Sequence, residues 1–367
     1  MKTLFDETRM GTMRLRNRLV RSATWEAMAD ETGRLTPRLL EVYRQLAEGG
    51  VGLIITSATT ITKDTTRLHG MLCIPDDSYI PAYRELTQMV HNTGCPIIMQ
   101  LDDGRTGEMW TPATPTLEEI QSIIREFGDA ASRAKQAGFD GVQIHAAHGF
   151  FLSQFLNVKK NTRTDQYGGD VAGRKRFLLE ICEEIRARTG VDFSILVKIN
   201  CSDFEEDDGV WDACQSACIH LAENGISAIE ISGGLDGSPF PPDSIPYDES
   251  VFRDFAAEIA KRVSVPVILV GLNRKLSVMS TLLNTTGIDY FSLSRPLLRQ
   301  PDLPNLWRAS PDEPAACISC DACINRPDGN VCPFRDDAKN YITSSSGPAR
   351  VLRATVTGGH SRPCRPP

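Results

Sequence analysis

Residues 141–176 read GVQIHAAHGFFLSQFLNVKKNTRTDQYGGDVAGRKR, in which an apolar run, two histidines, a second apolar run and a polar loop follow one another. The run Val142–Ile144 is typical of a buried strand and leads directly to His145 and His148. Two imidazoles three residues apart at a strand end can face one cleft, and each can donate a hydrogen bond to the same atom. The alternative is a structural pair. The extended polar loop that follows favours a functional site.

Eight strand-like runs alternate with amphipathic segments along the chain. The expected strands are 19–24, 51–58, 96–101, 141–147, 194–200, 228–234, 266–271 and 290–296, and the expected helices are 37–49, 80–94, 117–138, 174–189, 210–225, 251–263 and 274–287. Repeated strand–helix units argue for parallel pairing with right-handed crossovers. The sequence therefore predicts an α/β fold, a (β/α)8 TIM barrel followed by a short cysteine-containing extension. A doubly wound open sheet is the alternative, but no G-x-G-x-x-G motif follows the first strand.

Chemistry in such barrels gathers at the C-terminal ends of the strands. Lys198 lies within an apolar strand, where a lysine is costly to bury without an anionic partner. Gly271, Ser294 and Arg295 follow the last two strands, where barrel enzymes often hold a phosphate group. Turn chemistry alone is the alternative for these three residues.

The motif H-A-A-H-G-F-F-L-S-Q-F-L, with N-x-R-T-D-x-Y-G-G downstream, closely resembles the Old Yellow Enzyme family of flavin-dependent ene-reductases. The resemblance is nearest to the FMN-binding part of the 2,4-dienoyl-CoA reductase type and covers residues 3 to 335. It implies FMN as cofactor and NAD(P)H as reductant. It also implies that His145 and His148 anchor the electron-withdrawing group of the substrate, where developing negative charge needs hydrogen-bond donors.

The same resemblance assigns residues to the cofactor. Lys198 matches the cation beside flavin N1, where positive charge stabilises the reduced flavin. Gly271, Ser294 and Arg295 match the phosphate cradle. The residues matching the pyrimidine side of FMN, with Trp25 beside them near the flavin C4 carbonyl, are Ser22, Ala23, Thr24, Ala58 and Gln100.

Three positions depart from the family pattern. Trp25 stands where many relatives carry Cys or Thr, and Phe150 stands where the motif usually has Tyr, so a hydroxyl is lost. The segment 100–105, QLDDGR, is shorter than the usual Q-L-x-H-A-G-R and carries two carboxylates, Asp102 and Asp103. These departures predict altered redox tuning, another proton donor and a different loop after the third strand, in which a cofactor contact from Arg105 is in doubt.

Cys317, Cys320, Cys323 and Cys332 follow a proline-containing linker. Their C-x2-C-x2-C spacing and the final Cys-Pro resemble the cluster-binding segment of dienoyl-CoA reductase-type relatives. An iron–sulfur cluster and zinc both suit this pattern, and free or structural thiols are the remaining alternative. We expect residues 1–310 to form the barrel, 311–340 the cysteine-rich extension and 341–367 a disordered tail.

Bulk composition restricts the partners. A net charge of −7 gives no electrostatic footprint for nucleic acid or an anionic membrane. The first residues lack the apolar core of a signal peptide, and no stretch approaches a membrane span in length. Scattered cysteines suit reduced thiols in a cytoplasmic protein. Small-molecule substrates and an oligomer are compatible with these properties.

The expected function is hydride transfer from NAD(P)H through FMN to an activated C=C bond. One alternative is an FMN-dependent amine dehydrogenase or demethylase that works in the oxidative direction. Another is a flavin-binding barrel without turnover.

Overall fold

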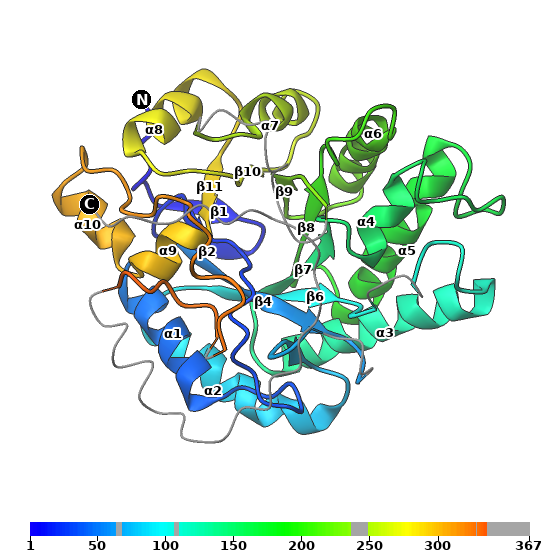
Figure 1. Cartoon of the computed structure of the whole chain (residues 1–367), viewed down its shortest axis with the longest axis horizontal. Coiled ribbons are helices and arrows are strands. Elements are labelled where there is room, and N and C mark those ends of the chain that lie inside the picture. The colour runs from blue at the N-terminus through cyan, green and yellow to red at the C-terminus, as the bar shows by residue number, and fades with distance from the viewer. Residues whose placement is uncertain (64–67, 106–109, 236–248, 328, 336–367) are drawn as a thin grey trace.

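A computed structural model describes residues 1–63, 68–105, 110–235, 249–327 and 329–335. Eight parallel strands form a closed barrel in its centre (Figure 1). The first strand pairs with the last one and also with the second, which closes the ring. The prediction of a (β/α)8 barrel is therefore confirmed. The strands are β3 (Leu19–Arg21), β4 (Leu53–Thr60), β6 (Ile97–Asp102), β7 (Gly141–Ala146), β8 (Ser194–Asn200), β9 (Ala228–Ser232), β10 (Val267–Leu269) and β11 (Tyr290–Leu293).

Helices surround the barrel and bury its outer surface (Figure 1). The crossover helices are α1 (Pro37–Glu48), α2 (Ile80–His91), α3 (Leu117–Gln136), α5 (Val171–Thr189), α6 (Val210–Glu223), α7 (Arg253–Ala260) and α8 (Leu276–Thr285). Local chemistry sets their ends: the Thr116 hydroxyl accepts from the Glu119 backbone N–H, and the Thr116 backbone N–H donates to the Glu119 carboxylate, a capping box at the start of α3. Three shorter helices, α4 (Phe151–Leu156), α9 (Arg295–Arg299) and α10 (Leu303–Ala309), complete the set.

The predicted helices 251–263 and 274–287 are longer than α7 and α8. Residues at each end of α7 belong to turns instead, such as the one in which the Arg262 backbone N–H donates to Ile259, and the residues at each end of α8 lie outside regular structure. Short elements that the sequence did not predict are β5 (Leu72–Cys73), which extends the sheet beside β4, and the 3-10 turn η1 (Asp77–Tyr79).

A hairpin of β1 (Thr8–Met10) and β2 (Met13–Leu15) closes the N-terminal end of the barrel. Its buried side chains, Met10, Met13 and Leu15, form one apolar cluster with inward-facing strand residues such as Ile98. This plug was not predicted, because its two strands lack the apolar runs by which the barrel strands were identified. It leaves the C-terminal end as the end at which polar side chains can gather.

The segment after α10 folds back onto the barrel. The Asn330 backbone N–H donates to the carbonyl of Glu26 at 2.7 Å, and its side chain donates to the carbonyl of Trp25 at 2.8 Å. Arg335 donates to Gln45 in α1 at 2.8 Å. The cysteine-rich extension is thereby attached to the loop that follows β3. The predicted division into 1–310, 311–340 and 341–367 stays a prediction, and residues 336–367 lie outside the described residues.

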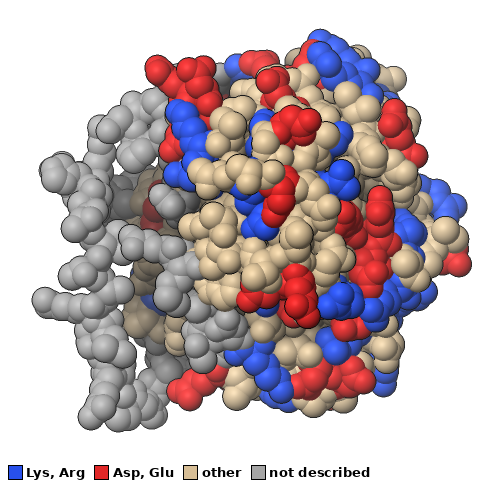
Figure 2. All heavy atoms as spheres, turned by 90° about the vertical axis from the view of Figure 1, so that its right-hand side faces the viewer, with Lys and Arg blue, Asp and Glu red and all other residues tan. Residues whose placement is uncertain are grey.

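No helix in the described part of the chain is both long and apolar enough to cross a membrane. The face shown in Figure 2 intersperses Lys and Arg with Asp and Glu, so that face presents no large patch of one sign.

Candidate active site

Two histidines lie in a hydrogen-bonded row at the C-terminal end of the barrel. His145, near the end of β7, places Nδ1 2.7 Å from Oδ2 of Asp102, the last residue of β6. Its Nε2 lies 3.4 Å from Nδ1 of His148, whose Nε2 lies 2.7 Å from the hydroxyl of Ser232 at the end of β9. Three strands thus contribute to one row of polar groups. The sequence predicted that both imidazoles can face one cleft, and the structure brings their ring nitrogens within 3.4 Å of each other.

His148 has an unusual backbone conformation. Its φ of 63° lies in the left-handed region, which a non-glycine residue adopts at a cost. The backbone N–H of His148 donates to Oδ1 of Asn200 at 2.9 Å, and Asn200 is held in turn by Asp203 at 2.6 Å. The end of β8 therefore fixes the turn that points the second imidazole back at the first.

Burial determines the charge of His148. Desolvation lowers its pKa well below 6.5, and the positive ends of His145 and Lys198 lower it further. His148 is therefore a neutral imidazole at neutral pH. A neutral ring donates from only one nitrogen, so the partner at the other nitrogen, Ser232, decides which one.

Lys198 lies in the middle of the barrel and has the anionic partner that the sequence argument required. Nζ of Lys198 is 3.4 Å from Oε1 of Glu230 and 2.8 Å from the hydroxyl of Ser22. Glu230 also accepts from Ser22, Gln143 and Ser292 at 2.8, 2.7 and 2.5 Å. Burial lowers the pKa of Lys198, and the charge of Glu230 acts in the opposite direction. Glu230 was missed from sequence, although a lone Glu within the strand-like AIEIS was a usable signal.

Parallel register brings together several residues that resemblance assigned to the pyrimidine side of FMN. Ala58 on β4 is the register partner of Gln100 on β6, beside an irregularity in the pairing. Gln100 donates to Gln143 at 2.8 Å, and Thr24 donates to the carbonyl of Ser22 at 2.9 Å. Ala23 follows Ser22 on the same loop and packs against the inner cluster of the barrel.

Trp25 points toward a neighbouring loop, because its indole N–H donates to the carbonyl of His69 at 3.0 Å. Its own carbonyl accepts from Asn330 of the extension. Trp25 therefore joins the barrel loop to the cysteine-rich segment.

Gly271 and Ser294 end β10 and β11, at the place predicted to hold phosphate. Gly271 has φ +107°, and a Cβ added there would lie 2.9 Å from the Phe252 ring. Only glycine fits this close approach. The hydroxyl of Ser294 lies 2.9 Å from that of Thr24, which links this cradle to the loop after β3.

Arg295, the first residue of α9, faces the cysteine-rich extension. It forms an ion pair with Asp321 and also lines the small cavity that holds the cysteines. The predicted contact of Arg295 with phosphate therefore competes with its ion pair to Asp321 of the extension.

The short loop after β6 is organised by its two carboxylates. Asp102 caps the turn by accepting from the backbone N–H of Gly104 at 2.8 Å, while Asp103 binds Arg105 at 3.2 Å. Arg105 also forms an ion pair with Glu126 in α3 at 3.3 Å, so these two contacts join the guanidinium to carboxylates of the protein. Burial and the neighbouring Asp102 raise the pKa of Asp103 to about 7, despite Arg105.

Phe150 lies beside the histidines at the start of α4. Its ring centroid is 4.9 Å from that of His145, and the ring planes are tilted by 46°. At this position, where the family motif has a tyrosine, an apolar ring thus lies beside His145. No proton can come from this side chain.

Cys317, Cys320, Cys323 and Cys332 line one cavity together with Arg295. Burial raises the pKa of Cys317 and raises that of Cys323 to about 11, which favours the thiol form. Within the described ranges, no three His, Cys, Asp or Glu side chains lie close enough together to hold a metal ion. The arrangement does not fit a bound cluster as it stands, and no chemical step is derived from one.

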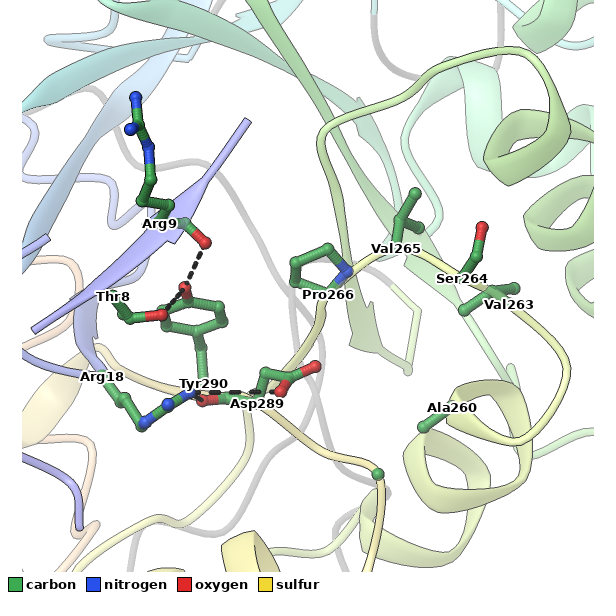
Figure 3. A pocket seen from close by; sticks show the side chains of 11 residues that line it. Thr8, Arg9, Arg18, Ala260, Val263, Ser264, Val265, Pro266, Asp289 and Tyr290 are labelled. Carbon is green, nitrogen blue, oxygen red and sulfur yellow. Dashed lines mark hydrogen bonds and ion pairs between the residues drawn. The ribbon is translucent and has the colours of Figure 1, made fainter. Parts of the chain in front are cut away.

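A cavity of about 230 Å³ lies at the opposite end of the barrel, against the β1–β2 hairpin (Figure 3). Arg18, Asp289 and Tyr290 line it, and the Tyr290 hydroxyl donates to the carbonyl of Arg9 at 2.9 Å. None of the predicted site residues lines this cavity. This cavity therefore lies at the other end of the barrel from the paired histidines.

Comparison with known proteins identifies the family. The model of the NADH:flavin oxidoreductase / NADH oxidase family matches residues 3–108 and 104–309. A metal reductase from Desulforamulus reducens is 32% identical over 349 residues, which cover 89% of this chain and 52% of that protein. This chain thus spans about half the length of that relative.

Two proteins of similar length also match. An NADPH dehydrogenase from Bacillus subtilis is 32% identical over 323 residues, covering 82% of this chain and 92% of that one. The structure of an Old Yellow Enzyme homologue from Zymomonas mobilis is 25% identical with a TM-score of 0.70, covering 85% of this chain and 94% of the other. The chain belongs to the NADH:flavin oxidoreductase / NADH oxidase family, the family of Old Yellow Enzyme.

Proposed function

We propose that this chain is an FMN-dependent oxidoreductase that takes hydride from NAD(P)H and reduces a C=C bond activated by a carbonyl group. The observation that carries the proposal is the convergence of His145 and His148 at the barrel mouth, with Lys198 paired to His145 in the strand register. A carbonyl oxygen that gains negative charge needs such donors. Family membership supports the same reaction class.

The residues at the mouth fit FMN. Ser22, Gln100 and Lys198 offer polar groups of the kind that recognise a flavin pyrimidine, and Gly271 keeps the backbone free of a side chain beside the Phe252 ring. Bound FMN would supply hydride storage between the nicotinamide and the alkene. Lys198 would place its positive charge beside the flavin, and the Glu230 carboxylate at 3.4 Å would partly neutralise that charge. Ser294 and Arg295 would bind the phosphate, with Trp25 at the edge of the site.

The histidines would orient the substrate and stabilise charge on its oxygen. His148 is suited to donate a neutral hydrogen bond, because burial keeps its ring uncharged. Since Phe150 has no hydroxyl, the proton for the substrate carbon would come from water.

Ligand binding tests this arrangement directly. A para-substituted phenolate resembles the charged oxygen of the reaction and should produce a long-wavelength absorption band with the bound oxidised flavin. The His145→Ala/His148→Ala double variant should bind FMN but lose the band. An unchanged band in the double variant would contradict the anchoring role of the pair.

The role of the extension, the location of the protein and its class of substrate are also proposed. The four cysteines of the extension are proposed to take up iron–sulfur or zinc, which requires them to move closer together than they are here. A cytoplasmic location is supported by the free state of the cysteines throughout the described ranges. Small molecules are the proposed substrates, and an oligomer is compatible with this function.

A further inference from the structure

His145 has partners at both ring nitrogens, and the two partners differ in whether they require a proton on the nitrogen that they face. Nδ1 can only donate toward Asp102 at 2.7 Å, because an ionised carboxylate has no proton to give. Nε2 is the nitrogen on the side of His148, where the proposed substrate oxygen would be bound. A neutral ring with its proton on Nδ1 would present a lone pair to that oxygen. The anchoring role therefore needs a proton on both nitrogens.

The geometry of Asp102 favours its ionised form. Oδ1 accepts from the Gly104 backbone N–H at 2.8 Å, and Oδ2 is taken by His145, so both oxygens act as acceptors. The side chain is only 4% exposed. A carboxylate charge buried in this way is costly unless a cation lies against it.

Other cations near the mouth have carboxylates of their own. Arg105 is bound by Asp103 and Glu126, and Lys198 is bound by Glu230. Within the described residues, the ring that contacts Asp102 is His145. A doubly protonated His145 and an ionised Asp102 together carry no net charge, which suits a site buried from water.

We propose that Asp102 is a positioning residue that holds His145 in its doubly protonated form and aims Nε2–H at the substrate oxygen. The proposal rests on the proposed function and adds the charge state of the pair to it. His145 supplies a charge-assisted hydrogen bond, which is stronger than a neutral one. His148 supplies the second, neutral bond, because the Ser232 hydroxyl can donate to its Nε2 and leave the proton on Nδ1.

The second His–Asp pair of the chain provides a matched control. At the other end of the barrel, Nε2 of His91 lies 2.8 Å from Oδ2 of Asp140, a contact of similar length on the surface. Asp140→Asn removes the same charge from that pair and leaves the barrel mouth unchanged.

Nuclear magnetic resonance of the full chain with isotope-labelled histidine tests the proposal without using turnover. At pH 7, both ring nitrogens of His145 should be protonated in the parent protein. Asp102→Asn should remove the proton from Nε2 but keep Nδ1–H, because the Asn carbonyl still accepts. Asp102→Ala should also allow the remaining ring proton of His145 to occupy either nitrogen. Asp140→Asn should alter the signals of His91 alone.

Kinetics then separate this proposal from the proposed function. In Asp102→Asn, the enone half-reaction should slow about a hundredfold, the typical cost of one oxyanion donor, whereas Asp140→Asn should leave both half-reactions at the parent rate. A singly protonated His145 in an active parent enzyme, or unchanged His145 signals in Asp102→Asn, would overturn the role of Asp102. Absence of flavin reduction by both NADH and NADPH in the parent would overturn the proposed function, and the magnetic resonance result would still decide the role of Asp102.

Discussion

The two ends of the barrel each carry a His–Asp pair, and the pairs differ in burial rather than in length. His145 and Asp102 at the mouth are 5% and 4% exposed, whereas His91 and Asp140 at the base are 39% and 30% exposed. The contacts measure 2.7 and 2.8 Å. Water screens the second pair and is excluded from the first, so the same contact has very different energetic consequences.

The base also holds the cavity of about 230 Å³, while the mouth holds the interlocked ionisable groups. The residues that line this cavity, such as Arg18 and Tyr290, are not among the candidate site residues. Buried charge, left-handed backbone at His148 and an apolar plug at the other end all point to the mouth. Buried electrostatics is therefore the better guide to function in this molecule.

The largest expected effect concerns the buried partner of Lys198. Glu230→Ala should lower the free energy of unfolding by about 3–5 kcal/mol, because it leaves an uncompensated charge inside the barrel. Chemical denaturation followed by circular dichroism measures this change. Glu258→Ala, which breaks exposed pairs with Lys261 and Arg262, should lower the free energy of unfolding far less, because water screens those pairs. Similar losses in both variants would contradict the dependence on burial.

The next effect is pH-dependent and concerns Asp103. Because its pKa is about 7 in the folded protein and 3.8 otherwise, the folded state binds the extra proton and loses stability as pH rises between these values. Asp103→Asn removes this loss. The variant should gain about 2–4 kcal/mol relative to the parent between pH 4 and pH 8, at about 1.4 kcal/mol per pKa unit. A pH-independent difference between the two proteins would show that Asp103 is ionised throughout.

A smaller effect is expected at the phosphate cradle. Arg295→Ala should weaken FMN binding by about 1.5–3 kcal/mol, the usual contribution of a charge-assisted contact. Fluorescence titration of the protein with FMN measures it. Asp321→Ala is the matched control, because it removes the ion pair of Arg295 with the extension and leaves the guanidinium in place. If Asp321→Ala weakened FMN as strongly as Arg295→Ala, the loss would come from the extension rather than from phosphate.

The smallest effect belongs to the base. Asp140 raises the pKa of His91 through a hydrogen bond, so the pair stabilises the fold below pH 6.5 and loses this contribution as pH rises through the raised value. Asp140→Asn should cost under about 1 kcal/mol at pH 6 and less at pH 9. Thermal unfolding at the two pH values checks the sign. A larger loss at pH 9 would contradict it.

Much of the fold could be predicted because strand and helix periodicities are long and regular. β8 was predicted to its end residues, and β7 to within one residue. The β1–β2 plug was not predicted, since its strands lack the apolar runs by which the barrel strands were identified. The lengths of α7 and α8 were overestimated, because an amphipathic pattern does not mark the exact residue at which a helix ends.

The candidate site was predictable where a residue type is unusual for its place in the sequence. His145, His148 and Lys198 stand out at or within apolar strands. Glu230 and Asp102 needed the structure, because their meaning depends on what lies beside them across the barrel rather than along the chain. The same holds for Asn200, which only the folded backbone connects to His148.

The central claim is that this barrel passes hydride from NAD(P)H to an activated alkene. Stopped-flow absorption of the FMN-loaded protein under anaerobic conditions measures the two half-reactions separately. We expect NADH or NADPH to bleach the flavin, and its colour to recover when 2-cyclohexenone is added, with loss of the alkene. A flavin that neither nicotinamide bleaches, or that an amine substrate bleaches instead, would contradict the claim.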